Sequence, residues 1–182
     1  KFNKFFPSLV SSNSIQSPDT ISMIVQVITM DRRLFVLDEK VYSNADLSQP
    51  LAPSDAVGKF LDFLEHNRKE WGLARDVFID CADQATIMEL KKWKRLHGSL
   101  YTFNDSYKKV EILDRIKFML GWIQQGCYLV VDTCREHLGE LDRYSWQEDK
   151  DLPEDRNDHT INASQYGWIP YRGLIGFEEA EK

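Results

Sequence analysis

Residues 21–42, ISMIVQVITMDRRLFVLDEKVY, decide the fold, because they contain two β-rich runs separated by a short polar turn. The runs 21–30 and 34–42 are rich in branched and aromatic residues, and only Asp-Arg-Arg stands between them. This arrangement predicts an antiparallel hairpin or meander. Two later stretches, DVFIDCAD (76–83) and CYLVV (127–131), are apolar and brief, which indicates buried strands.

Helical patterns alternate with the later strands. Residues 84–98 predict a helix that stops at Gly98, and Thr133 with Glu136 forms a capping box for a helix that reaches about Tyr144. Two further helices are predicted from their apolar faces, one capped by Ser54 with the stripe Val57, Phe60, Leu61 and Leu64, and one over 107–126 with the face Val110, Leu113, Ile116, Leu120 and Ile123.

The order of the elements predicts the fold class. The chain begins with a serine-rich stretch up to Pro18 that predicts a loop. Strands come next, and strands then alternate with helices, the last of which is predicted over RNDHTINASQYGW (156–168). This order predicts an α/β fold, a mixed sheet flanked by helices. Because the chain has 182 residues and no visible internal repeat, we expect a single domain over 1–182.

Composition excludes several classes of protein. Hydrophobic residues make up 42% of the chain and charged residues 29%, which excludes wholesale disorder. The longest apolar runs are too short to cross a bilayer and no signal peptide is visible, so we expect a cytoplasmic protein. As an isolated domain of this size without an exposed heptad pattern, it is expected to be monomeric. The cysteines Cys81, Cys127 and Cys134 lack CxxC spacing, which argues against a disulfide framework and a zinc site.

Charge is segregated along the chain. The net charge of −6 argues against a protein that grips nucleic acid over its whole surface, because such binding neutralises phosphates. A local basic patch stays possible, since KKWKR (91–95) has four positive charges in five positions, whereas residues 148–158 have six acids against two bases. Each run taken alone is typical of a solvated face.

Candidate metal ligands lie at a strand end and on the last helix. Asp80 ends a predicted buried strand, where functional groups gather in α/β sheets. The alternative is that Asp80 caps the following helix or accepts backbone hydrogen bonds, although Asp83, three residues later, is the better placed helix cap. Asp158, His159 and Asn162 fall three and four positions apart and therefore share one side of a helix. If that side meets the strand end, its oxygen-rich cluster suits Mg²⁺ or Mn²⁺.

Three stretches carry a resemblance to a known family. They are FIDCADQATIMELKK (78–92), NDSYKKVEILDRIKFML (104–120) and CREHLGELDRYSWQEDKDLPEDRNDHTINASQYGW (134–168). In this order, from about Ile21 to about Trp168, the chain resembles the C-terminal nuclease domain of the large terminase subunit of tailed bacteriophages. The resemblance implies a ribonuclease H-like fold and metal-dependent endonucleolytic cutting of concatemeric viral double-stranded DNA during genome packaging.

The resemblance also implies a site with three carboxylates, and this chain departs from it at two of them. Asp80 matches the second acid, and His159 matches the histidine three residues before the third. Asn162 stands at the third acid, and Ser11 stands at about the first. Two-metal cleavage needs clustered negative charge, so we expect weakened metal binding.

Three explanations for the neutral residues stay open. They are engineered replacement, natural loss of the acids, or a substitute acid supplied by Asp158, Asp19 or Asp83. Asp158 is the best placed of these, because it lies one turn before Asn162 on the same side of the helix.

The family also implies partners: the terminase ATPase domain, the small terminase subunit and the portal protein, in the cytoplasm of the bacterial host. No GxxxxGK[ST] phosphate loop occurs in the chain, so the ATPase lies elsewhere. The basic residues that we expect near DNA are Lys91, Lys92, Lys94, Arg95, Lys108 and Lys109. One alternative is a disabled module of the same fold that binds DNA or docks to the portal or motor. Another is a resolvase or transposase of the same superfamily.

Overall fold

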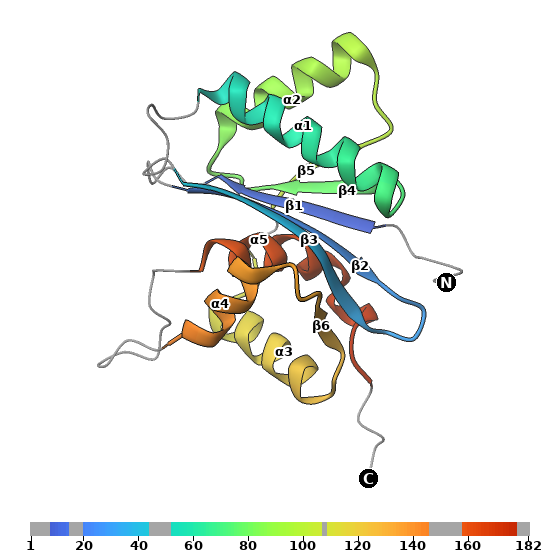
Figure 1. Ribbon diagram of the computed structural model, residues 1–182, viewed down its shortest axis with the longest axis vertical. Helices are drawn as coiled ribbons and strands as arrows, with labels where there is room; N and C mark the ends of the chain where they lie inside the picture. Colours follow the sequence, from blue (N-terminus) through green and yellow to red (C-terminus); the bar gives the residue numbers. More distant parts are fainter. Residues whose placement is uncertain (1–7, 15–19, 44–51, 107–108, 146–157, 178–182) are drawn as a thin grey trace.

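A six-stranded mixed sheet divides the molecule into two layers (Figure 1). The computed structural model describes residues 8–14, by their backbone, and residues 20–43, 52–106, 109–145 and 158–177. The strands are β1 (Ser8–Ser14), β2 (Thr20–Ile28), β3 (Leu34–Ser43), β4 (Ala74–Ile79), β5 (Thr102–Asp105) and β6 (Tyr128–Val130). Their order in the sheet is β5-β4-β1-β2-β3-β6. Strand β2 pairs antiparallel with both β1 and β3, and the other neighbouring strands pair in parallel.

Helices cover both faces of the sheet. They are α1 (Pro53–Glu70), α2 (Gln84–His97), α3 (Ile112–Gln124), α4 (Arg135–Arg143), α5 (His159–Trp168) and the short 3-10 helix η2 (Ile169–Leu174). Figure 1 shows α1 and α2 on one face, whereas α3, α4 and α5 lie on the other. The described residues include no helix that is both long and apolar enough to span a membrane.

Strand β2 contributes side chains to both hydrophobic cores. It pairs antiparallel with β3, which confirms the predicted hairpin. Met23, Val25 and Val27 pack with α1 and α2, while Ile24 and Ile28 pack with the helices of the opposite layer. This alternation follows from the two-residue period of a strand, because successive side chains point to opposite faces. A central strand whose two faces are both covered is mostly apolar, and β2 is so except for Thr20 at its start and the buried Ser22 and Gln26.

The turn between β2 and β3 holds the segment that follows α5. Arg32 adopts a left-handed backbone conformation with φ of 63°. Its Nε donates to the Gly176 carbonyl at 2.6 Å, and the Gly176 amide donates back to the Arg32 carbonyl at 2.9 Å. These bonds fasten the end of the described chain to the sheet, so α5 is fixed at its C-terminal side.

Two strands were not predicted. β1 occupies the serine-rich start that the sequence assigns to a loop, yet it lies inside the sheet between β4 and β2. β5 is a short edge strand of four residues. Both have weak apolar periodicity, and their strand conformation depends on pairing with β4. Tertiary pairing therefore overrides local composition here.

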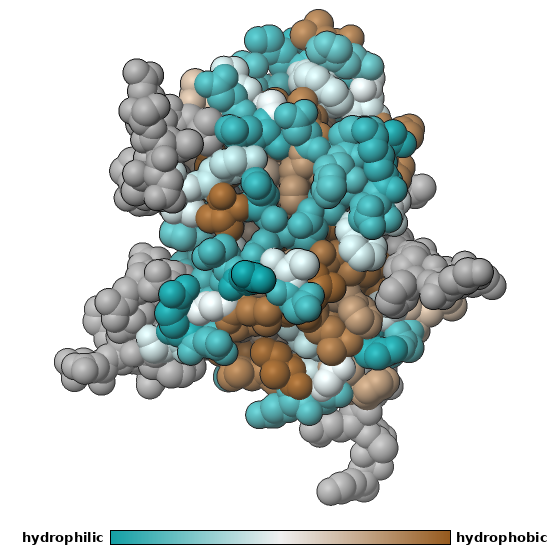
Figure 2. Space-filling view, in the orientation of Figure 1, coloured by the Kyte–Doolittle hydropathy of each residue, from teal (hydrophilic) through white to brown (hydrophobic). Residues whose placement is uncertain are grey.

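The predicted apolar face of α3 is partly wrong, since Ile116 is buried and Val110 packs against the core but Leu120 and Ile123 do not face inward. The buried residues of this helix are Ile116, Met119 and Trp122, whereas Leu120 and Ile123 are 47% and 42% exposed. α3 has apolar residues around most of its circumference, so periodicity alone could not select the inward face. Figure 2 shows apolar side chains at the surface of the layer below the sheet.

The predicted helix caps are partly wrong. Ser54 is not a cap, because α1 begins at Pro53 after Ala52. The capping box of Thr133 and Glu136 is also not formed, because the N-cap of α4 is Cys134, without a side-chain cap bond. Instead Glu39 of β3 accepts hydrogen bonds from the amides of Glu136 (2.8 Å) and His137 (2.9 Å). A carboxylate from the sheet thus caps α4 from outside.

We expect Glu39→Ala to lower the free energy of unfolding by about 1 kcal/mol, because it leaves two amides at a helix start without their acceptor. Thr133→Ala is the matched control and should change stability by less than about 0.5 kcal/mol. Urea unfolding followed by circular dichroism measures both. An equal loss in the two variants would mean that α4 is capped from within its own sequence.

Candidate functional site

Asp80 lies directly after β4 and faces α5. Its side chain is 3% exposed, and its Oδ1 accepts from the Ala82 amide at 2.9 Å. The cap of α2 is Asp83, whose carboxylate accepts from the Thr86 amide at 3.1 Å, as predicted. Asp80 is therefore not used as the helix cap. Its second oxygen, Oδ2, accepts from the Tyr166 hydroxyl at 3.2 Å, so the strand end does meet the last helix.

The N-cap residue Asp158 and two residues of α5 form a polar stripe along one side of the helix, and the last of the three contacts Asp80. Asp158, Asn162 and Tyr166 are spaced by four residues and therefore lie along one side of the helix. The Asn162 side-chain amide donates to Asp158 Oδ2 at 2.9 Å. Because helical side chains lean toward the N-terminus, the Tyr166 hydroxyl on Asp80 reaches back along the turn that carries Asn162. Asn162 is thus the middle member of the stripe.

Two tyrosines and one arginine belong to this region and were not given a role from the sequence. Burial, and then the Asp80 charge, raises the pKa of Tyr166 above its ordinary value. Burial, and then the Asp158 charge, raises the pKa of Tyr144 to about 12. The guanidinium of Arg115 opposes both pKa shifts, so a cation lies near both hydroxyls. Tyr166 stands in the family-like motif, but its bond to Asp80 depends on tertiary packing.

The other predicted acids and ligands fall in different places. His159 is the first residue of α5 and is partly exposed. Burial raises the pKa of Glu140, and the charge of nearby His159 opposes that rise, which places His159 on the Glu140 side. Ser11 lies within β1, in register with Ile24 and Phe78. Asp19 lies outside the described residues.

The predicted basic residues do not form one patch. Lys91 pairs with Asp105 at 3.6 Å, and Asp105 is in register with Ile79, so Lys91 lies at the rim next to Asp80. Lys94 donates to the Tyr101 carbonyl at the opposite end of β5.

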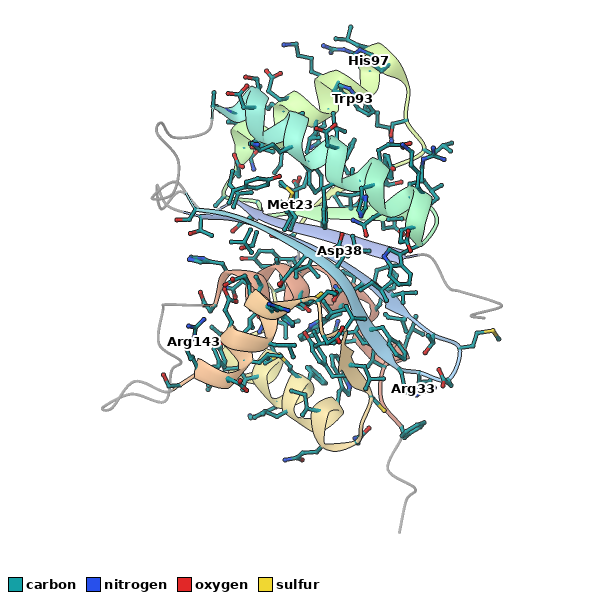
Figure 3. The ribbon with its side chains drawn as sticks, in the orientation of Figure 1. Met23, Arg33, Asp38, Trp93, His97 and Arg143 are labelled. Atoms are coloured by element: carbon teal, nitrogen blue, oxygen red, sulfur yellow. The ribbon has the colours of Figure 1, made fainter. Side chains whose placement is uncertain are left out.

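The remaining basic residues are exposed, except for one that lies outside the described part of the chain. Lys92 pairs with Glu89, Arg95 and Lys109 are exposed, and Lys108 lies outside the described residues. Figure 3 shows Trp93 and His97 on α2 away from the sheet, where their rings stack at 5.4 Å.

The donor set decides which cation could fit. Within the described residues, no group of three or more His, Cys, Asp and Glu side chains could hold a metal ion. Asp80 and Asp158 supply two negative charges, while Asn162 supplies an uncharged oxygen. Two divalent cations would leave a positive excess that these groups do not offset. The residues present therefore do not fit a pair of divalent cations.

A chain of buried hydrogen bonds positions the opposite side of α5. Ser164 Oγ donates to Gln26 Oε1 at 3.0 Å and lies 2.8 Å from the Tyr128 hydroxyl. The Tyr128 hydroxyl lies 2.8 Å from His137 Nε2, and His137 Nδ1 lies 3.0 Å from Thr160 Oγ1. His137 is fully buried, with an exposure of 0%. Its position in a short helix gave no sign of burial.

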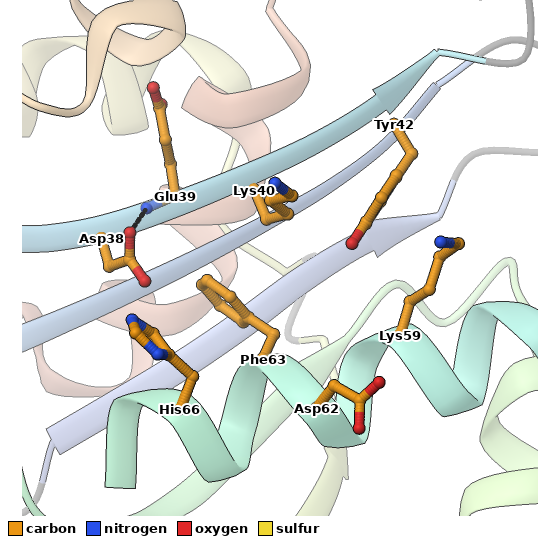
Figure 4. A pocket seen from close by; sticks show the side chains of 8 residues that line it. All are labelled: Asp38, Glu39, Lys40, Tyr42, Lys59, Asp62, Phe63 and His66. Carbon is orange, nitrogen blue, oxygen red and sulfur yellow. Dashed lines mark hydrogen bonds between the residues drawn. The ribbon is translucent and has the colours of Figure 1, made fainter. Parts of the chain in front are cut away.

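A hollow of about 360 Å³ lies on the other side of the sheet, between β3 and α1 (Figure 4). Its lining residues are Asp38, Glu39, Lys40, Tyr42, Lys59, Asp62, Phe63 and His66. Figure 4 shows the Glu39 side chain turning away from α1, in agreement with its role at α4. The hollow includes none of the predicted site residues and is separate from Asp80.

Comparison with solved structures identifies proteins that share this fold. No family model and no curated protein matches the sequence. Solved structures do match, first the large terminase of a thermophilic bacteriophage, with a TM-score of 0.76 and 17% identity over 96% of this chain and 41% of that chain. This chain therefore spans less than half the length of that terminase.

Two further matches cover most of both chains. The nuclease domain of the bacteriophage SPP1 large terminase, with bound Mn, has a TM-score of 0.65 and 16% identity over 92% of this chain and 88% of that one. The yeast mitochondrial Holliday junction resolvase Ydc2 has a TM-score of 0.53 and 10% identity over 94% and 84%. The predicted ribonuclease H-like fold is confirmed, and the terminase nuclease domains share it over most of this chain.

Acid should destabilise the fold through His137. Burial lowers the pKa of His137 to about 4 from an ordinary 6.5, so between these values the unfolded chain binds a proton that the folded chain does not. The stability is fully present above pH 6.5 and is lost as the pH falls toward 4, by about 1.4 kcal/mol per pH unit. Urea unfolding at pH 7, 6 and 5 measures this loss.

The control for this prediction is His137→Gln, which should lose less stability between pH 7 and pH 5 than the natural protein. Glu140 works in the opposite direction, because burial raises its pKa, but it is present in both proteins. Parallel stability curves for the two proteins would contradict the prediction.

Proposed function

We propose that this chain is the nuclease domain of a large terminase and that it hydrolyses phosphodiester bonds of double-stranded DNA weakly, with a divalent cation. The observation that carries the proposal is the hydrogen bond from Tyr166 to Asp80, with Asn162 one turn before Tyr166. It joins the strand-end acid to the last helix, one turn after the position where the resemblance implies an acid. The fold shared with the SPP1 nuclease domain supports the same reading.

Asp80 would hold the cation, with the side-chain oxygen of Asn162 and the carboxylate of Asp158 beside it, and His159 would assist as a further ligand or proton carrier. Bound there, Mg²⁺ or Mn²⁺ supplies a more acidic water and a charge that offsets the leaving oxygen. The protein's own part is to keep Asp80 buried and to hold Asn162 opposite it. The neutral Asn162 and Ser11 lower the negative charge, so the proposed activity is weak.

Lys91 is the best placed of the basic residues to contact a DNA phosphate, because it lies at the rim of the strand end that carries Asp80. Lys92, Arg95 and Lys109 are exposed and would extend the contact along the backbone, as would Lys108 and Lys94. Such contacts set affinity and register without reading the base sequence.

The partners of the whole terminase follow from the same proposal. Since this chain spans 41% of the terminase of the thermophilic bacteriophage, an ATPase domain would belong to the remainder of a longer protein. The small terminase subunit and the portal protein would be further partners, in the cytoplasm of an infected bacterial host.

Asn162→Asp should raise Mn²⁺-dependent cutting of a supercoiled plasmid by at least about tenfold, because one added carboxylate near a divalent cation contributes more than about 1.4 kcal/mol. Asp80→Asn should abolish the cutting in both backgrounds. Asp142→Asn, an exposed acid on α4, is the control and should leave the rate unchanged. If neither Asn162→Asp nor Asp80→Asn changes the rate, the proposed site is not the source of cutting.

A second function is favoured by one specific observation. Asp80 and Asp158 already accept hydrogen bonds from Tyr166 and Asn162, so the remaining acids are stabilised without a cation. The chain could then bind DNA, or dock to the packaging motor, without cutting. The same fold and the same basic residues would serve that role.

Thermal unfolding with millimolar Mn²⁺ separates the two functions. A cation that binds only the folded state raises the melting temperature, by an amount equivalent to about 2.7 kcal/mol at a hundredfold excess over Kd. For the nuclease we expect a rise that Asp80→Asn removes. A melting temperature that Mn²⁺ leaves unchanged would favour the module that does not cut.

A further inference from the structure

The N-terminus of α5 is capped by a residue from another helix. The N-cap of α5 is Asp158, but its side chain makes no cap hydrogen bond. Glu140 of α4 takes that role, because its Oε2 accepts from the amides of Thr160 at 2.8 Å and Ile161 at 3.1 Å. The Thr160 hydroxyl donates to the same oxygen. One carboxylate oxygen therefore satisfies the first turn of the helix.

The two amides that Glu140 takes are the ones that an N-cap Asp ordinarily takes. They belong to the second and third residues of the helix, and an Asp at the N-cap accepts from either of them. Asp158 instead accepts from the side-chain amide of Asn162 at 2.9 Å. The carboxylate of Asp158 is thus turned along the helix toward the site and away from the helix end.

Glu140 is firmly held in this position. It is 6% exposed, and the hydroxyl of Thr160 that donates to it also lies 3.0 Å from His137 Nδ1. His137 belongs to the same helix as Glu140, and the amide of His137 is capped by Glu39 of the sheet. The sheet therefore fixes α4, and α4 in turn fixes the start of α5.

We propose that Glu140 is a positioning residue: by capping α5 in place of Asp158, it keeps the Asp158 carboxylate beside Asn162 in the site. The position of Asp158 does not depend on the proposed function. Only the consequence rests on it, which is that the Asp158 carboxylate lies beside Asn162 where a cation near Asp80 would be bound. Without Glu140, the two vacant amides and the positive end of the helix would attract Asp158. The carboxylate would then leave Asn162.

A metal-free experiment tests the position of Asp158. In Glu140→Ala, the side-chain amide of Asn162 should lose its acceptor, so its ¹H resonance should move upfield and its protons should exchange faster in ¹⁵N NMR spectra. Glu140→Gln keeps an acceptor oxygen and should preserve the Asn162 resonance. Asp142→Asn removes the same charge from an exposed position on α4 and is the matched control. An unchanged Asn162 resonance in folded Glu140→Ala overturns the proposal.

Glu140→Ala could unfold the chain, and circular dichroism checks this before the comparison. If it unfolds, Glu140→Asp decides, because its shorter side chain withdraws the carboxylate while the charge remains. The Asn162 resonance should then shift as described for Glu140→Ala. A resonance equal to that of the natural protein would again overturn the proposal.

A double-mutant cycle on Mn²⁺ affinity tests the consequence for the site. By calorimetric titration, Glu140→Ala and Asp158→Asn should each weaken Mn²⁺ binding by about tenfold, as for groups that support a metal ligand. The double variant should be no weaker than either single one, because both act through Asp158. Additive losses would contradict a role through Asp158. If the natural protein binds no Mn²⁺, the proposed function fails, while the NMR result still decides the role of Glu140.

Discussion

The structure depends on carboxylates that cap helices from outside their own sequence. Glu39 caps α4 and Glu140 caps α5, so the sheet, α4 and α5 are joined in series by charge-assisted hydrogen bonds to backbone amides. Each bond uses an orphan amide that a helix start must satisfy in some way. Because the partner lies on a neighbouring element, satisfying the helix end also fixes the angle between the two elements.

The last helix uses polar groups on two sides for different purposes. Thr160 and Ser164 bond to the buried network of Tyr128, His137 and Gln26, which costs desolvation but specifies one register against the sheet. On another side of the helix, Asn162 donates to Asp158 and Tyr166 donates to Asp80. A purely apolar contact could slide by a turn with little loss. The network does not allow this, so α5 keeps one register against the sheet.

The sequence was informative where local rules decide the structure. The β2–β3 hairpin, the Asp83 cap and the stop of α2 at Gly98 follow from alternation and capping, and each was predicted. The meeting of Asp80 with α5 followed from the family resemblance. The capping of α4 by Glu39 and the burial of His137 could not be predicted, because residues 39 and 136 are far apart in the chain and only the fold joins them. Strand β1 could not be predicted for the same reason, because its strand conformation depends on pairing with β4, which is distant in the sequence.

The neutral residue at position 162 has a physical logic of its own. A carboxylate there would stand one turn from Asp158 on the same side of the helix, where two negative charges repel each other unless a cation binds. An amide removes one charge and donates a hydrogen bond to Asp158, so the same stripe is stable without metal. A site with three acids ties its stability to its cations, whereas this one does not. Asn162 therefore gives a helix face whose polar groups satisfy each other.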